Sequence, residues 1–299
     1  MPSAPVLLVA TLLTAGLLGG CTTHETTEPP ASRSATTGTA ATSPDSPGSA
    51  RSGGVSSGPA PSGPVSPGAA SSDRRTTRPL AGVRIGIDPG HNGRNYTDPG
   101  YLSTQVWNGR TSEDCNTTGT ETDDGYPEAD FTWAVAGYLA ADLRRAGAHV
   151  VLTRHSNTGV GPCVDRRAEI INDAHADVAI DIHADGASAS ARGFAILQPV
   201  ASGINDAVIG RSHRYARILR DEFAKTGMPV SDYLGSDGLT TRDDLAGLNL
   251  TSVPQVLIEC GNMRNAQDAA LLRAPAFQRR AATRIATAMA TFLGRRYPG

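Results

Sequence analysis

Apolar residues recur along residues 82–295 in two patterns, which predict strands and helices in alternation. Short apolar runs bounded by turn-forming residues, typical of buried strands, occur at 82–88, 148–154, 177–183, 193–200 and 254–260. Apolar positions three or four residues apart, typical of amphipathic helices, occur at 127–147, 163–176, 205–225 and 275–296. This alternation predicts an α/β fold, a single domain with a largely parallel twisted sheet flanked by helices on both faces.

The first predicted helix has the clearest boundaries. Pro127 opens it, where a missing N–H costs least, and Gly147 follows its end, where a left-handed residue is common. Its apolar stripe recurs every four residues, at Phe131, Val135, Leu139 and Leu143. The polar connection before it, residues 94–127, is unusually long, which indicates that it is either functional or pinned.

The N-terminal part of the chain differs in composition from the rest. Residues 1–21 are apolar but too short and too rich in small residues for a membrane span, and they fit a signal peptide. The segment LLGGC resembles a lipobox, which would attach lipid to Cys21; an ordinary cleaved signal is the alternative. Residues 22–80 are mainly Ser, Thr, Ala, Gly and Pro, which predicts a disordered tether. The folded domain is then 81–299, in a protein exported to the cell envelope, either lipid-anchored or released.

Charge and cysteine content narrow the function further. The net charge is −2 and no run of Lys or Arg occurs, so the sequence does not predict nucleic-acid binding. In an oxidising compartment, Cys115 and Cys163 are candidates for a disulfide because both lie in polar, loop-like sequence. Cys260 lies in an apolar run and is expected to be a buried thiol. We expect the protein to be a monomer.

Four side chains suited to metal chemistry fall at one edge of the predicted sheet. His91 and His183 follow or end strands, Glu259 ends the last strand, and Glu128 lies in the first turn of the first helix. In open α/β sheets, ligands bind outside the carboxyl ends of the strands. Glu128 also precedes Phe131 by three residues and so shares the buried stripe. A carboxylate that only complements the helix dipole is the alternative for Glu128.

Two histidines and one carboxylate with an open fourth position form a typical catalytic zinc site. A nearby carboxylate can then take a proton from the metal-bound water. Glu128, at a rigid helix start, fits the ligand role and Glu259 fits the base, although topology alone does not settle this assignment. Asp88 and Asp181 are candidates for orienting the ligands. For Asp88, which precedes Pro89 and Gly90, a simple turn is the alternative.

Four motifs in order carry a family resemblance: IDPGHNG, PEADFTWAVAGYLAADLRRAGAHVVLTR, RRAEIINDAHADVAIDIHAD and VPQVLIECGNMRNAQDAALL. They resemble the zinc-dependent N-acetylmuramoyl-L-alanine amidases of the Amidase_3 family over nearly all of 82–295. The long loop and its cysteines are similar to the mycobacterial and actinobacterial branch. The family often has Asn where this chain has Asp185.

The resemblance implies Zn²⁺ held by His91, Glu128 and His183, with Glu259 as the catalytic glutamate. It also implies cleavage of the amide between the lactyl group of muramic acid and L-Ala, in peptidoglycan or muropeptide fragments. A zinc peptidase that cuts within the stem peptide is the first alternative. A non-catalytic wall-binding lipoprotein is the second, although such a protein would be expected to lack one of these four residues.

Overall fold

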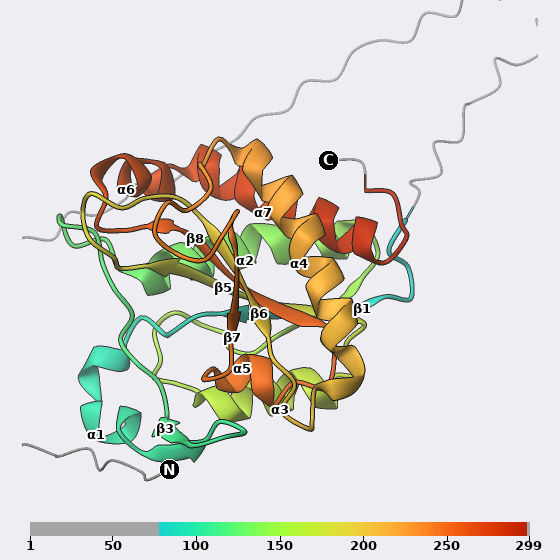
Figure 1. Cartoon of the computed structure of the whole chain (residues 1–299), viewed down its shortest axis with the longest axis horizontal. Helices are drawn as coiled ribbons and strands as arrows, with labels where there is room; N and C mark the ends of the chain where they lie inside the picture. The colour runs from blue at the N-terminus through green and yellow to red at the C-terminus, as the bar shows by residue number, and fades with distance from the viewer. Residues whose placement is uncertain (1–77, 298–299) are drawn as a thin grey trace, which may run out of the picture. The chain divides into compact units, whose positions relative to one another are not determined.

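A six-stranded sheet runs through the computed structural model, which describes residues 78–297 (Figure 1). In sheet order the strands are β4 (His149–Leu152), β1 (Arg84–Pro89), β5 (Val178–Asp185), β8 (Gln255–Asn262), β6 (Ala195–Pro199) and β7 (Leu239–Arg242). The first four are parallel, whereas β6 runs antiparallel to β8 and β7 runs parallel to β6. The predicted largely parallel sheet is therefore confirmed. The predicted signal peptide, with Cys21, lies outside the described residues, as does nearly all of the predicted tether.

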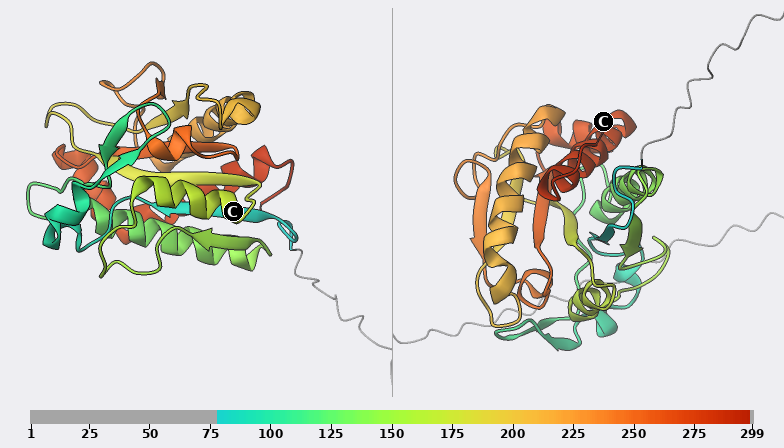
Figure 2. Two further views of the ribbon diagram at one scale, coloured as in Figure 1. Left: turned by 90° about the horizontal axis from the view of Figure 1, so that it is seen from below. Right: turned by 90° about the vertical axis from the view of Figure 1, so that its right-hand side faces the viewer.

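Helices cover both faces of this sheet, as predicted (Figure 2). One face carries α2 (Glu128–Arg145), α4 (Ile209–Phe223) and α7 (Pro275–Phe292). The other carries α3 (Val164–Asp173) and the short α5 (Ala246–Asn249). Three shorter helical segments follow β6 and β8: η2 (Asp206–Val208), η3 (Ala224–Thr226) and α6 (Ala266–Arg273). Between residues 78 and 297, no helix has both the length and the apolar character needed to span a membrane.

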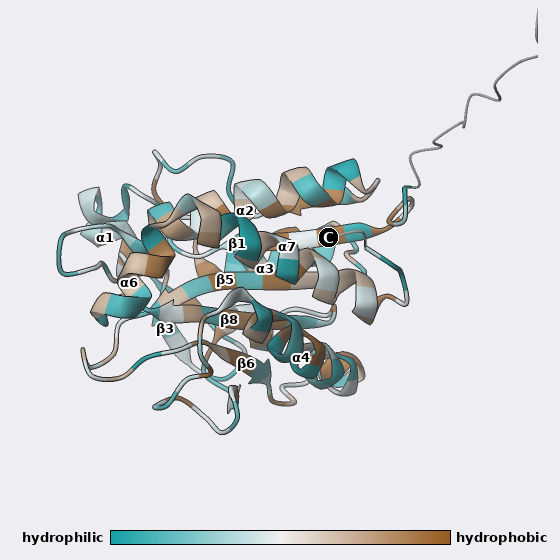
Figure 3. Ribbon diagram, turned by 90° about the horizontal axis from the view of Figure 1, so that it is seen from above, coloured by the Kyte–Doolittle hydropathy of each residue, from teal (hydrophilic) through white to brown (hydrophobic). Residues whose placement is uncertain are grey.

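The amphipathic patterns explain how the helices attach to the sheet. All four stripe residues of α2 are fully buried, and Gly147 after its end has a φ of +99°. In Figure 3 the ribbon of α4 alternates between hydrophilic and hydrophobic residues along its length. Together α2, α4 and α7 enclose the largest of the hydrophobic cores with the inner residues of β1, β5 and β8. Leu80, at the end of the predicted tether, is buried in that core, and its N–H donates to the carbonyl of Ala146 (2.9 Å).

The connection between β1 and α2 is more structured than its polar sequence indicated. It contains η1 (Asn95–Thr97), α1 (Pro99–Leu102) and a two-stranded hairpin, β2 (Gln105–Trp107) with β3 (Ser112–Asp114). The Cys115–Cys163 disulfide is present and fastens the end of this hairpin to the start of α3. Cys260 is a buried free thiol, as expected. The loop is therefore pinned.

Three further elements lie in stretches for which the sequence predicted no helix or strand. The Gly-, Asp- and Thr-rich stretch after Gly227 contains β7 and α5, and α6 follows β8. Strand β7 is an edge strand and its residues are half-buried or exposed, so it has no continuous apolar run. Helix α6 has only eight residues, which is too short for a clear periodic stripe.

Candidate active site

The register of the parallel strands aligns the polar residues at their carboxyl ends. His183 on β5 lies beside Glu259 on β8. Because side chains alternate along a strand, Asp181 points to the same face of the sheet as His183. Ile180 and Ile182 point the opposite way, into the core beneath α2. The face that carries His183 and Glu259 is thus the one free to form a pocket.

His91 reaches this pocket through an unusual backbone conformation. It follows β1 with a φ of +58°, in the left-handed region that residues other than glycine seldom adopt. Its Nδ1 lies 3.1 Å from the carbonyl oxygen of Thr117. Its ring meets the ring of His183 edge to face, with centroids 4.8 Å apart and planes at 84°.

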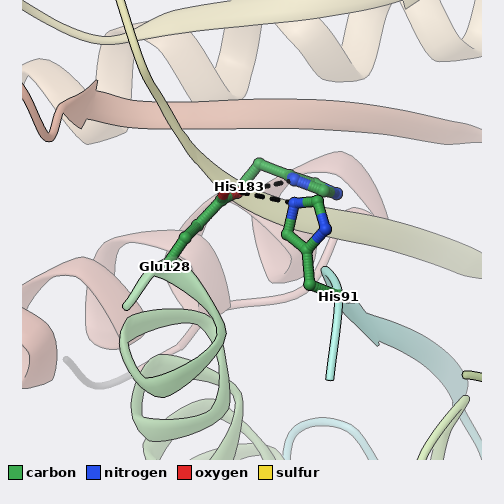
Figure 4. A group of neighbouring side chains, drawn as sticks. All are labelled: His91, Glu128 and His183. Atoms are coloured by element: carbon green, nitrogen blue, oxygen red, sulfur yellow. Dashed lines mark hydrogen bonds and ion pairs between the residues drawn. The ribbon is translucent and has the colours of Figure 1, made fainter. Parts of the chain in front are cut away.

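Glu128 bridges the two imidazoles (Figure 4). Its Oε2 lies 3.1 Å from His91 Nε2, and its Oε1 lies 2.8 Å from His183 Nδ1. The same oxygens accept the backbone N–H groups of Thr120 (3.0 Å) and Ala184 (3.1 Å). Burial opposes ionisation of Glu128, but the charges and hydrogen bonds of the two histidines hold its pKa below the usual range.

Glu259 lines the same pocket but has a different environment. Its Oε2 is buried and accepts no hydrogen bond from the residues that the structure describes. Burial raises the pKa of this carboxyl well above its ordinary value. A buried carboxylate oxygen without a partner is costly unless a cation or a substrate donor lies against it. The two glutamates are therefore chemically distinct, one fully paired and one poised to bind a proton.

The pocket around these residues has a volume of about 490 Å³. One wall is formed by Glu113 and Asp114 of β3, and another by Arg242 of β7. Arg242 pairs with Asp244 through two contacts of 2.6 Å, in line with an ordinary surface ion pair. The volume lies in the range of pockets that enclose most of a small ligand.

The donor set fits zinc. One ligand atom from each of His91, Glu128 and His183 can be chosen so that all lie within 4.8 Å of one another. Two imidazole nitrogens and one carboxylate oxygen suit zinc better than magnesium or calcium, which prefer oxygen ligands. The unpaired oxygen of Glu259 in the same pocket is the position expected of a proton acceptor.

Several residues that shape the cluster were not found from the sequence. A Cβ on Gly90 would lie 2.3 Å from His183 Cε1, and one on Gly119 would lie 2.8 Å from Glu128 Oε2. Both glycines therefore make room for the cluster. The unusual length of 94–127 was the only signal for Gly119, Thr117 and Thr120.

An α/β fold with a His–Glu–His cluster and a further glutamate at the carboxyl edge of its sheet has the layout of a hydrolase with a metal site. Comparison with known families makes this specific. The family described as N-acetylmuramoyl-L-alanine amidase, Amidase_3, matches residues 85–291, and the chain belongs to this family. The enzyme is thus a peptidoglycan amidase by class.

Individual relatives agree with this assignment. The chain is 40% identical to the N-acetylmuramoyl-L-alanine amidase Rv3717 of Mycobacterium tuberculosis over 224 residues, 75% of this chain and 91% of the relative. The crystal structure of the amidase Ami1 from Mycobacterium smegmatis has a TM-score of 0.68 and 40% identity, covering 72% of this chain and 98% of that one. The apo form of Ami1 from Mycobacterium abscessus also has a TM-score of 0.68, with 38% identity over 72% of this chain and 100% of that one.

Proposed function

We propose that this enzyme hydrolyses the amide bond between the lactyl group of N-acetylmuramic acid and L-Ala of the stem peptide. The substrate is peptidoglycan or a muropeptide fragment. His91, Glu128 and His183 hold Zn²⁺, and Glu259 is the general base. The observation that carries this proposal is the placement of a buried, unpaired carboxylate oxygen in the same pocket as the His–Glu–His cluster.

Zinc held by His91, Glu128 and His183 would supply a Lewis acid that lowers the pKa of a water and polarises a carbonyl group. Glu128 is itself held in place, because its two oxygens accept the backbone N–H groups of Thr120 and Ala184. Glu259 takes the proton of the attacking water at Oε2. The raised pKa of this carboxyl lets it hold the proton until it passes to the leaving nitrogen of L-Ala.

We also propose that residues 1–21 are a signal peptide and that residues 22–80 are a tether. They would deliver a monomeric catalytic domain to the outer side of the membrane, where peptidoglycan lies. Lipid attachment at Cys21 would keep the domain within a tether's reach of the membrane, whereas simple cleavage would release it.

The role of Glu259 is tested with Glu259→Gln, which preserves the shape of the side chain. We expect kcat on a defined muropeptide to fall by about 10²–10⁴-fold, the usual contribution of a general base. Zinc content should stay at one per chain. Glu169→Gln is the matched control, because Glu169 is an exposed partner of Arg166 on α3. Retention of wild-type kcat in Glu259→Gln would exclude Glu259 as the base.

A further inference from the structure

Two buried arginines surround the backbone that carries His91. Arg167 donates from Nη1 to the carbonyl of Pro89 (2.8 Å) and from Nη2 to the carbonyl of His91 (2.7 Å). Arg154 donates from Nε to the same Pro89 carbonyl (2.9 Å) and from Nη2 towards that of Gly90 (3.4 Å). Three successive carbonyl groups, at residues 89–91, are therefore held by two guanidinium groups.

This backbone needs to be held. The left-handed conformation of His91 is strained for a residue that has a Cβ atom, and it persists only where the surroundings impose it. A chain that relaxed from this conformation would turn the imidazole away from Glu128. The arginine donors oppose such a change because they bind the carbonyls of His91 and of the two residues before it.

The carboxylate of Asp88 offsets the repulsion between the two buried arginines. Two guanidinium groups that share one carbonyl repel each other, and both are buried. Asp88 Oδ1 lies 2.6 Å from Arg167 Nη1 and also accepts the hydroxyl of Thr153. Asp88 is thus more than part of a turn, since its carboxylate neutralises the arginine that binds His91.

Each arginine also connects this backbone to a second part of the site. Arg154 Nη2 donates to the carbonyl of Ala129 (3.2 Å), the residue after Glu128. Arg167 Nε donates to the carbonyl of Pro162 (2.9 Å), which also accepts the Asn116 side chain (2.9 Å). The first contact fixes His91 relative to the start of α2. The second fixes it relative to the segment that places Thr117 against its ring.

We propose that Arg154 and Arg167 are positioning residues that set the geometry of the metal ligands. Zinc affinity therefore depends on these two arginines, and so does folding. This inference rests on the proposed zinc site. Arginine is required because its planar fork reaches several oxygens at once, whereas the ammonium group of lysine is a single compact donor.

The test compares Arg167→Lys with the wild-type full chain, by zinc affinity from chelator competition and by the visible spectrum of the Co²⁺-substituted protein. We expect zinc affinity to fall by about 10–100-fold, as for other residues that orient ligands, with shifted Co²⁺ absorption bands. The control is Arg192→Lys, because Arg192 also pairs with a buried carboxylate, Asp268 (2.9 Å), but does not line the pocket. It should keep wild-type affinity and spectrum.

A structural role alone gives a different result. If Arg167→Lys lowers the melting temperature while zinc affinity and the Co²⁺ spectrum match the wild type, the inference is wrong. If Arg167→Lys does not fold, Arg154→Lys is judged by the same two readouts. Failure of the wild type to bind zinc would instead overturn the proposed metal site itself, and this inference with it.

Discussion

Replacement of Gly90 by alanine tests the geometry of the site with a single carbon atom. The added Cβ would lie 2.3 Å from Cε1 and 2.5 Å from Nε2 of His183. The backbone at Gly90 cannot easily retreat. Its N–H donates to the carbonyl of Ile182 (3.0 Å), and its carbonyl accepts the hydroxyl of Thr132 (2.8 Å). The His183 ring must therefore move.

The size of that movement follows from ordinary contact distances. Carbon atoms in van der Waals contact lie about 3.5 Å apart or more, so the ring must shift by roughly 1 Å. A displacement of about 1 Å in a catalytic group can cost on the order of 10²-fold in rate. We therefore expect kcat/KM of Gly90→Ala to fall about 100-fold, with weaker zinc binding.

The assay is release of the stem peptide from a defined muropeptide, measured alongside zinc content and melting temperature. Gly137→Ala is the matched control, because Gly137 is exposed on α2 and a Cβ there would meet nothing within 4 Å. This control should keep wild-type kcat/KM and raise the free energy of unfolding by roughly 0.5–1 kcal/mol. Wild-type kcat/KM and zinc content in Gly90→Ala would refute the reasoning, since His183 would then not be fixed where the structure places it.

Two further predictions concern stability. Replacing both Cys115 and Cys163 by serine removes a bridge between residues 48 apart in sequence, which should lower the free energy of unfolding by about 4 kcal/mol in urea denaturation. The difference should vanish when the wild type is reduced; if it persists, the bridge is not its cause. Glu259→Gln should raise the melting temperature of the chelator-treated protein at neutral pH but not at acid pH. The pKa of Glu259 is higher in the folded state than in the unfolded chain. The free energy of unfolding therefore falls as pH rises above the ordinary carboxyl pKa, and it stops falling once pH passes the folded-state pKa. An equal gain at both pH values would contradict this origin.

The sequence predicted that the four candidate residues lie together, because the carboxyl ends of parallel strands meet at one edge, and the structure places all four around one pocket. His183 and Glu259 each end an apolar run, and the structure places them side by side on neighbouring strands. The burial of Glu128 followed from its spacing to the stripe of α2, which is a purely local pattern. These inferences needed periodicity and topology but no tertiary contacts.

The supporting residues could not be found in the same way. Arg154 and Arg167 look like surface arginines in the sequence, and only the tertiary fold shows that both are buried against three backbone carbonyls. Gly90 reads as part of a tight turn, whereas its lack of a side chain also makes room for an imidazole from another strand. Interactions between residues far apart in the chain do not produce a periodic pattern in the sequence, so sequence periodicity cannot predict them.

The most direct test of the central claim is mass spectrometry of the products from a defined muramyl peptide, with zinc present and after chelation. The account predicts two products with zinc, the free muramyl sugar and a stem peptide with L-Ala at its N-terminus, and neither product after chelation. Fragments cut within the stem peptide would contradict the proposed bond. Undiminished release of the L-Ala peptide from fully metal-free enzyme would contradict the proposed role of the His91, Glu128 and His183 cluster.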